Sequence, residues 1–249
     1  MKKPIISALA LGLLPLFFMT SSYAQKASAD STASSYVESY IVSNYNKAVG
    51  EQSRLYNGIE YTAYSPLIKS NANFHDLKDL VAGTVMFDGY TFTKVPMLYD
   101  LNKDLLVVQL YNKVSNYILA SDRVSSFDID GQHFVYISAD TVNNKTFSSG
   151  FYGQFYSGKT EATARYSKSI QNLTSGNDIE TYFTTTKKQF YIKRGADYEA
   201  VSSEGDILKL LKDHKKELQQ YIKANDLNFK KAPEKSIAAI TSYYDHLNH

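Results

Sequence analysis

The sequence predicts an α+β fold: a mostly antiparallel β-meander sheet, arranged as a sandwich or a partly closed barrel, with one helix before it and a pair of helices after it. Three observations predict this fold. Short aromatic and β-branched runs alternate with turn residues from residue 55 to residue 201, and apolar residues recur at two-residue steps within these runs. From Ser203 onward the apolar period changes to three and four residues, which is typical of helices.

The first 24 residues have the three parts of a secretory signal peptide. Lys2 and Lys3 precede an apolar run over residues 5–19, and a small-x-small sequence follows at residues 22–24. The apolar run contains Pro15 and is too short to span a bilayer comfortably, so we expect cleavage and no transmembrane segment in the mature chain. The sequence therefore predicts export to the periplasm or the cell exterior.

Cysteine usage and charge narrow the class of protein. The chain has no cysteine, which excludes a lipid-anchored lipoprotein and disulfides, so its stability must come from a packed core. Its 27 basic and 25 acidic residues become equal in number when Lys2 and Lys3 leave with the signal peptide, which gives no footprint for nucleic acid. The 21 tyrosines suit both a strand-rich core and a recognition surface.

The mature chain is predicted to begin with a tether and a helix. Residues 25–35 are small and polar, so we expect a flexible tether. A single domain over residues 36–249 follows. Its first element is an amphipathic helix over residues 36–48, which would dock on the sheet by Val37, Ile41 and Tyr45 because these side chains share one helical face.

Turn residues divide the β region into predicted strands. Residues 83–112 form the central meander, broken at Asp88-Gly89, at Pro96 and at residues 100–104. Residues 55–64 are strand-like, and residues 66–79 are predicted to be a loop that crosses the sheet. No repeat of fixed length occurs, which excludes a propeller or a solenoid. Further strands are predicted at 117–120, 124–129, 132–138, 151–156, 160–170, 190–193 and 198–201.

The C-terminal region predicts two helices. Ser203 is the N-cap of the first, over residues 203–225, with Asp206 at the third position. Lysines on its other face are interleaved with acidic residues, as on an ordinary solvated helix. A linker containing Pro233 leads to the second helix, over residues 234–247.

Several segments together resemble a family of uncharacterised exported proteins of Bacteroidota-type Gram-negative bacteria. In chain order they are LYNGIEY, GTVMFDGYTF, VPMLYDLNKD, SSGFYGQFYSGK and SYYDHL. The resemblance covers most of the mature chain and depends on turn glycines, strand aromatics and the pair Tyr99-Asp100. It implies export and a single-domain layout, and it implies no catalytic residue because such proteins have no assigned activity.

No catalytic or metal-binding motif has the spacing that its chemistry requires. Residues 100–104 match the start of a calcium loop, but Leu105 stands where the loop needs glycine and Tyr111 where it needs glutamate, so we interpret them as an Asx-type turn. The five histidines show no zinc-binding spacing, and the nucleophile-elbow, P-loop and dinucleotide-binding motifs are absent. The sequence thus predicts no cofactor, no metal site and no catalytic residue.

We therefore expect a non-catalytic protein of the periplasm or cell envelope that binds an envelope ligand or protein partner through Tyr-rich strand and loop surface. The candidate binding residues are Tyr99, Asp100, Asn102 and Asp104, because polar and aromatic groups are densest there. Two alternatives remain open: a hydrolase of an envelope polymer, with carboxylates assembled across the sheet, and a structural or assembly subunit, which an exposed apolar patch would indicate.

The position of five side chains distinguishes these hypotheses. Convergence of Asp100, Asp104, Asp128, Asp130 and His133 in one cavity would favour a metal site or a hydrolase. Separate hydrogen-bonded turns would instead give these carboxylates an architectural role.

Overall fold

The computed structural model describes residues 40–41, 44, 55, 58–110, 113–142, 147–176 and 178–248. The predicted signal peptide and tether lie outside the described residues, as does most of the predicted first helix. Tyr40, Ile41 and Asn44 are helical, but Ile41 is 60% exposed and does not dock on the sheet as predicted. No helix in the described part of the chain is long and apolar enough to cross a membrane.

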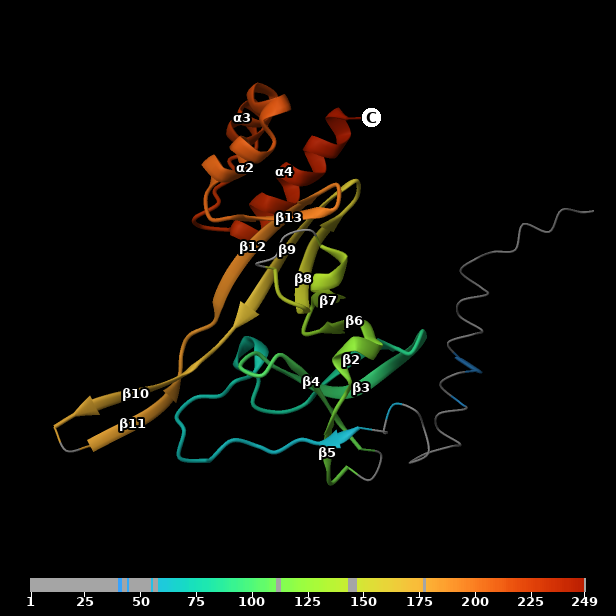
Figure 1. Cartoon of the computed structure of the whole chain (residues 1–249), viewed down its shortest axis with the longest axis vertical. Helices are drawn as coiled ribbons and strands as arrows, with labels where there is room; N and C mark the ends of the chain where they lie inside the picture. The colour runs from blue at the N-terminus through green and yellow to red at the C-terminus, as the bar shows by residue number, and fades with distance from the viewer. Residues whose placement is uncertain are drawn as a thin grey trace, which may run out of the picture.

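Eleven of the described strands form one antiparallel sheet, in the order β1-β5-β4-β3-β2-β6-β7-β8-β9-β12-β13 (Figure 1). The order does not return to its first strand, so the sheet is open and β1 and β13 are its edges. The α+β fold with a mostly antiparallel sheet is thus confirmed. The strands are β1 (Ile59–Glu60), β2 (Val81–Phe87), β3 (Tyr90–Asp100), β4 (Leu105–Gln109), β5 (Asn116–Ile118), β6 (Val124–Ile129), β7 (Gln132–Ile137), β8 (Gly150–Ser157), β9 (Thr160–Ser167), β12 (Lys187–Arg194) and β13 (Asp197–Val201).

A separate two-stranded ribbon, here called the arm, projects from the body of the molecule (Figure 1). It consists of β10 (Ile170–Ser175) and β11 (Asp178–Phe183). The sequence interpretation missed this hairpin and extended the preceding strand to Ile170, whereas β9 ends at Ser167. The arm's strands are rich in polar residues, and this weakens the apolar alternation on which strand prediction depends.

The large sheet curls strongly around an aromatic core. Tyr99 on β3 and Phe151 on β8 are separated in the sheet by β2, β6 and β7. Since adjacent strands lie about 4.8 Å apart, a flat sheet would hold them roughly 19 Å from each other. Their ring centroids are only 5.9 Å apart. Phe127 and Phe134 are buried between them, so strands distant in the sheet share one core.

Helices close one part of the concave face (Figure 1). We call α2 (Glu204–Leu210), α3 (Lys215–Ala224) and α4 (Pro233–Leu247) the helical cover. The cover contacts β8, β9 and β13, and its apolar side chains join the main core. Three of the short 3₁₀ helices are η4 (Ser121–Arg123), η5 (Ala139–Thr141) and η6 (Lys212–His214).

A long connection covers the other part of the concave face of the sheet. Residues 61–79, here called the crossing segment, run from β1 to β2 and contain one 3₁₀ helix, η3 (Phe74–Asp76). Phe74 inserts into the core, where its ring meets those of Tyr99, Phe134 and Tyr166. The predicted crossing loop at residues 66–79 thus contains no strand. The predicted strand at residues 55–64 was too long, because among its described residues the strand β1 covers Ile59 and Glu60 alone, which pair with β5.

Two sequence-based boundaries were wrong for tertiary reasons. Pro96 does not break the meander; it lies inside β3, where only β2 flanks it because pairing with β4 begins at Met97. The predicted helix over residues 203–225 is interrupted after Leu210. There, Arg194 donates to the Leu210 carbonyl and to the Asp213 carboxylate.

The N-termini of α2 and α4 lie at or next to the predicted residues. Ser203 is the N-cap, and its hydroxyl accepts from the Asp206 N–H. Pro233 is the first residue of α4 rather than part of a linker, a position that proline favours because its missing N–H would have no helical partner there.

Candidate functional site

Asp100, at the end of β3, is fully buried and surrounded by donors. Its carboxylate accepts from the hydroxyls of Tyr61 (2.9 Å) and Tyr64 (3.0 Å) and from the backbone N–H groups of Asn102 (2.9 Å) and Lys103 (3.0 Å). The two backbone bonds are those of the predicted Asx-type turn. The two tyrosine bonds attach the start of the crossing segment to this turn.

Asp104, at the other end of the same turn, belongs to a second network. Its carboxylate accepts from the Tyr99 hydroxyl (2.6 Å), the Arg165 guanidinium (2.8 Å) and the Phe151 N–H (3.4 Å). Burial raises the pKa of Asp104, although the bonds from Tyr99 and Arg165 act in the opposite direction. Burial also raises the pKa of Tyr99 well above its ordinary value. The network ties the β3–β4 turn to β8 and β9.

The four candidate binding residues lie at the end of β3 and in the turn that follows it, and none of them lines the groove described below. Tyr99 and Asp100 have no exposed surface, and Asn102 donates from its side-chain amide to the Tyr64 hydroxyl (2.9 Å). Direct contact of these four residues with a ligand stays a prediction. In the structure Asp100 bonds to both Tyr61 and Tyr64, and Asn102 bonds to Tyr64, so these two residues hold the tyrosines in place.

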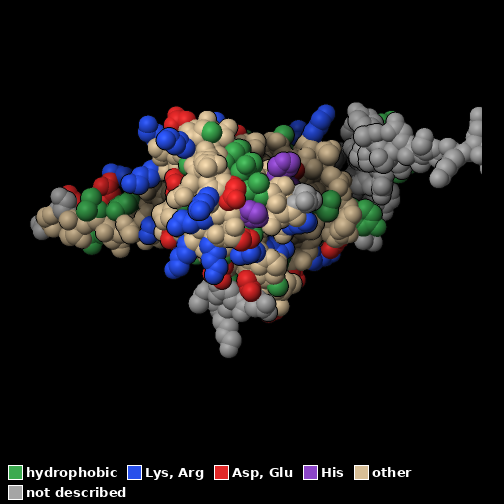
Figure 2. All heavy atoms as spheres, turned by 90° about the horizontal axis from the view of Figure 1, so that it is seen from above, with side chains coloured by type: hydrophobic (Ala, Val, Ile, Leu, Met, Phe, Trp, Pro, Cys, Tyr) green, Lys and Arg blue, Asp and Glu red, His purple; other side chains and the backbone are tan. Residues whose placement is uncertain are grey.

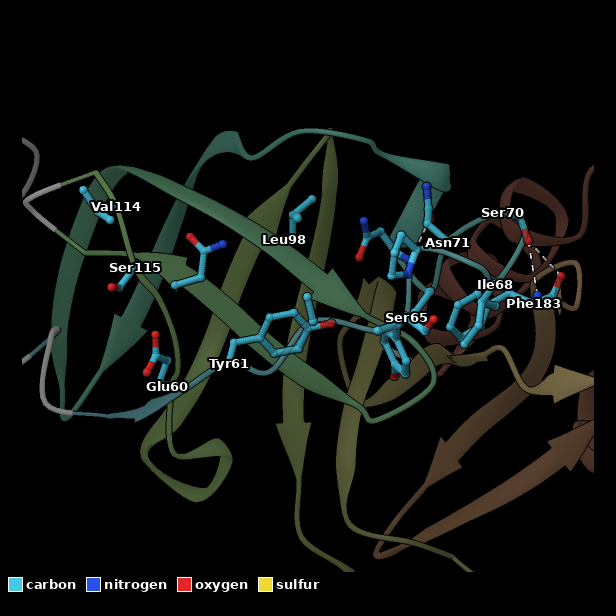
Figure 3. Close-up of a pocket in the computed structure, with 16 residues that line it drawn as sticks. Glu60, Tyr61, Ser65, Ile68, Ser70, Asn71, Leu98, Val114, Ser115 and Phe183 are labelled. Atoms are coloured by element: carbon cyan, nitrogen blue, oxygen red, sulfur yellow. Dashed lines mark hydrogen bonds between the residues drawn. The ribbon is translucent and has the colours of Figure 1, made fainter. Parts of the chain in front are cut away.

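Tyr61 and Tyr64 form one wall of a groove between the crossing segment and the outer face of β3 and β5 (Figure 3). The groove has a volume of about 560 Å³. Its lining residues come from β1, the crossing segment, β3, the turn before β5, β5 and the base of the arm. They are Glu60, Tyr61, Ala63, Tyr64, Ser65, Pro66, Ile68, Ser70, Asn71, Ala72, Asn73, Leu98, Val114, Ser115, Asn116 and Phe183.

The walls of the groove are fixed by hydrogen bonds and ring contacts. The Tyr64 ring meets the edge of Phe183 with centroids 4.8 Å apart. The Phe183 N–H donates to the Ser70 hydroxyl (3.2 Å), which in turn donates to the Phe183 carbonyl (Figure 3). The Lys103 ammonium lies 5.0 Å from the ring centroid of Tyr61 and 4.3 Å from that of Tyr64.

The tyrosine hydroxyls stay protonated at neutral pH. Burial raises the pKa of both Tyr61 and Tyr64, and the Asp100 carboxylate raises both further. Since an un-ionised hydroxyl is a donor, each one can keep its bond to Asp100 across the physiological pH range.

One groove residue has an unused acceptor. The Asn116 side chain lines the groove, and its Oδ1 atom is buried without a hydrogen-bond partner. A buried amide oxygen without a donor is costly, so a ligand hydroxyl or amide that reached it would recover the lost bond.

The other side chains tested for convergence lie elsewhere. His133 pairs with Asp128 across β6 and β7 through Nδ1 (2.8 Å), and His75 pairs with Asp130 through Nδ1 (2.7 Å). Both exposed pairs lie at the β6–β7 hairpin, and neither includes Asp100 or Asp104. Among the described residues, no group of three or more His, Asp or Glu side chains is placed to hold a metal ion.

The sequence interpretation missed the groove because its residues come from distant parts of the chain. Tyr61 and Tyr64 lie in a stretch read only as strand, and Phe183 ends a strand that was not predicted. The one sequence signal was the density of tyrosine around Asn57-Gly58, and it gave no indication of the bond to Asp100, 36 positions away from Tyr64.

Comparison of the chain with protein-family models, with curated proteins and with solved structures found no match.

Proposed function

We propose that this protein is an exported, non-catalytic binding protein of the periplasm or cell envelope, and that it holds its ligand in the groove beside the crossing segment. The observation that carries the proposal is the pair Tyr61 and Tyr64, two aromatic side chains held on one wall by the buried Asp100. Export is supported by the predicted signal peptide and by the family resemblance.

The rigidity of the walls favours binding. Tyr61 and Tyr64 are fixed through their hydroxyls, and Ser70 fixes Phe183, so a ligand would not need to order these rings. Groups that are ordered before binding lose less conformational entropy when the ligand arrives, which increases affinity.

The chemistry of the lining favours a neutral ligand. Its polar groups are mainly hydroxyls and amides, from Ser65, Ser70, Asn71, Asn73 and Asn116. No lysine or arginine occurs among the described residues that line the groove, and the Lys103 ammonium beside the two tyrosine rings already donates to the Thr62 carbonyl (3.2 Å). Aromatic rings beside neutral hydrogen-bonding groups suit a ligand with apolar faces and hydroxyl edges, such as a neutral saccharide.

The distribution of carboxylates favours binding over hydrolysis. Glu60 is the single acidic side chain in the described lining, whereas glycoside hydrolysis ordinarily needs two facing carboxylates. Asp100 and Asp104, in the neighbouring β3–β4 turn, are already engaged by tyrosine, arginine and backbone donors.

The test is a binding measurement on the chain from residue 25 onward. We expect a panel of neutral oligosaccharides on an array to include a ligand, whose affinity is then measured by isothermal titration calorimetry. Ala63→Trp should abolish binding, because Ala63 is exposed and lines the groove. Ala196→Trp is the matched control, because Ala196 is also exposed and lies in the turn between β12 and β13, outside the groove.

Three results would contradict the proposal. They are the absence of any oligosaccharide ligand, equal binding by the Ala63→Trp and Ala196→Trp variants, and release of shortened oligosaccharides, detected by mass spectrometry, from the wild-type protein. The last result would instead support the hydrolase hypothesis.

A further inference from the structure

The arm exposes apolar surface to solvent. It projects from the body as a two-stranded ribbon, with apolar side chains along it (Figure 2). Ile170 is 40% exposed, Leu173 53% and Ile179 71%. A two-stranded ribbon without packing is marginally stable in water, and exposed apolar residues together on such an element indicate a contact with another surface.

The two edges of the arm differ in their pairing. At the base of the arm, the outer edge of β11 pairs with the crossing segment: the Lys69 N–H donates to the Thr181 carbonyl (2.8 Å), and the Phe183 N–H donates to the Lys69 carbonyl (3.1 Å). No segment in the described part of the chain pairs with the outer edge of β10. The unpaired edge is therefore that of β10.

The register of the hairpin shows which residues face outward along this edge. Just below the arm, the Thr184 N–H donates to the Ser169 carbonyl, so the pair Ser169 and Thr184 is hydrogen-bonded. Pairs alternate along an antiparallel ladder. The backbone groups of Ile170, Asn172 and Thr174 therefore point away from β11, while those of the residues between them bond to it.

The chemistry of the edge favours strand addition. Residues 170–175 contain no charged residue and no proline, the features that ordinarily protect an edge strand from pairing. β11, in contrast, carries Asp178 and Glu180. A second β10 strand is neutral and would place no acidic side chain beside the first, whereas pairing through β11 would bring these carboxylates together.

We propose that two copies of this protein associate through their β10 strands, which pair antiparallel about a two-fold axis at Asn172 and join the two arms into a four-stranded sheet. In this register Asn172 lies opposite the partner subunit's Asn172, and Ile170 lies opposite the partner subunit's Thr174. All three outward residues of each strand then form backbone pairs. The interface is isologous and closed, so it stops at a dimer.

The same register covers the exposed isoleucines. Thr174 lies opposite Ile179 within one arm. The partner subunit's Ile170 lies on the other side of Thr174, so the row across the joined sheet runs from Ile179 through Thr174 to the partner subunit's Ile170. Residues in such a row pack side by side on one face, which removes apolar surface of both copies from water.

Analytical ultracentrifugation of the chain from residue 25 onward tests the proposal with two proline variants. Asn172→Pro removes an outward N–H without removing a backbone hydrogen bond inside the arm, because proline is tolerated at an edge position whose N–H faces solvent. We expect the wild type to dimerise reversibly, and Asn172→Pro to raise the dimer dissociation constant about tenfold or more. Thr181→Pro is the matched control: Thr181 lies opposite Asn172, and both variants lose the hydrogen bond between their side chains (2.9 Å). It should dimerise like the wild type.

A cysteine variant tests the register, since the chain has no cysteine of its own. Cα atoms of a hydrogen-bonded antiparallel pair lie about 5.5 Å apart, within the range of a disulfide. Asn172→Cys should therefore form a covalent dimer on mild oxidation, and Thr181→Cys should remain monomeric on a non-reducing gel. A monomeric wild type, equal dimerisation by Asn172→Pro, or equal cross-linking by both cysteine variants would overturn the proposal.

Discussion

The helical cover and the crossing segment each attach to the sheet through a buried aspartate at a hairpin turn, but their surroundings differ. Asp245 of α4 accepts from the Thr160 N–H (3.0 Å), the Thr160 hydroxyl (2.9 Å) and the Tyr156 hydroxyl (3.1 Å), at the turn between β8 and β9. Asp100 performs the same task between β3 and β4 for the crossing segment. The helical cover adds many apolar side chains to the main core, among them Leu211, Leu218 and Ile237, whereas the crossing segment adds chiefly Phe74.

The difference follows from backbone hydrogen bonding. A helix satisfies most of its own N–H and C=O groups, so the helical cover can bury leucine and isoleucine and needs few polar anchors. The crossing segment is irregular, and its carbonyls need outside donors. Lys168 supplies them: its side chain is 1% exposed, and its ammonium donates to the carbonyls of Asn71 (2.9 Å) and Asn73 (3.1 Å) and to the Asp76 carboxylate.

The comparison also explains where the groove lies. Apolar side chains that interdigitate between helices and a sheet leave little open space. An irregular segment held at separate polar points does not fill the space beside it, and the groove follows this segment.

The largest expected effect lies in the helical cover. Leu211 is fully buried in the core, so Leu211→Ala should lower the free energy of unfolding by roughly 2 to 5 kcal/mol. Urea unfolding followed by circular dichroism measures the change. Leu67→Ala is the matched control, because Leu67 is 86% exposed and its truncation should change stability by less than about 0.5 kcal/mol. An equal effect of both variants would show that the cover does not dock by its apolar face.

The next effect lies in the crossing segment. Asp100→Ala leaves two tyrosine hydroxyls and two backbone N–H groups without their acceptor, so we expect a loss of roughly 2 to 4 kcal/mol. Folding should be weakened more than ligand binding, which calorimetry on the remaining folded protein would check. The control is Asp140→Ala, at an exposed residue of η5. Normal stability combined with lost binding would instead give Asp100 a direct binding role.

Alkaline pH should act on the crossing segment through its tyrosines. Burial first and Asp100 second raise the pKa of Tyr61 above its ordinary value of 10.0, and burial likewise raises that of Tyr64. A tyrosine with a raised pKa in the folded state stabilises the fold fully below about pH 10, and this contribution is lost as the pH rises further, because the unfolded chain ionises first. Urea unfolding measured at several pH values above about pH 10 should show this loss. The free energy of unfolding should fall less steeply with pH in Tyr64→Phe than in the wild type. The same pH dependence of the free energy of unfolding in both proteins would contradict a stabilising role for Tyr64.

The smallest effect is expected at the start of the helical cover. Ser203→Ala removes the N-cap bond to the Asp206 N–H (3.2 Å), which should cost about 1 kcal/mol. Thermal unfolding of the Ser203→Ala variant measures this cost. The control is Ser157→Ala, which changes an exposed serine at the end of β8. A cost as large as that of Leu211→Ala would mean that capping, rather than apolar packing, holds the cover.

Local signals predicted most elements of this fold. Asp88-Gly89 and Asp130-Gly131 mark real hairpin turns, with positive φ angles at all four residues, and Ser203 starts a helix. The arm was missed because its strands alternate poorly between apolar and polar residues. The interruption of the helix after Leu210 was missed because Arg194, from another hairpin, contacts it.

The candidate site was predicted only in part. The sequence interpretation singled out Tyr99, Asp100, Asn102 and Asp104 as candidate binding residues, and their contact with a ligand stays a prediction. In the structure Tyr99 and Asp100 are fully buried, so they are not surface groups. Burial depends on what packs over a turn, here the crossing segment, and a local pattern contains no information about that contact.

The sequence by itself determined the kind of fold and the location of most turns and helix starts, because propensity, period and turn chemistry act over a few neighbouring residues. Only the tertiary structure decided the curl of the sheet, the groove and the unpaired edge of the arm. These features arise from contacts such as Tyr64 with Asp100, 36 positions apart, and Thr160 with Asp245, 85 positions apart. Such contacts form because the whole chain must satisfy its buried polar groups at once.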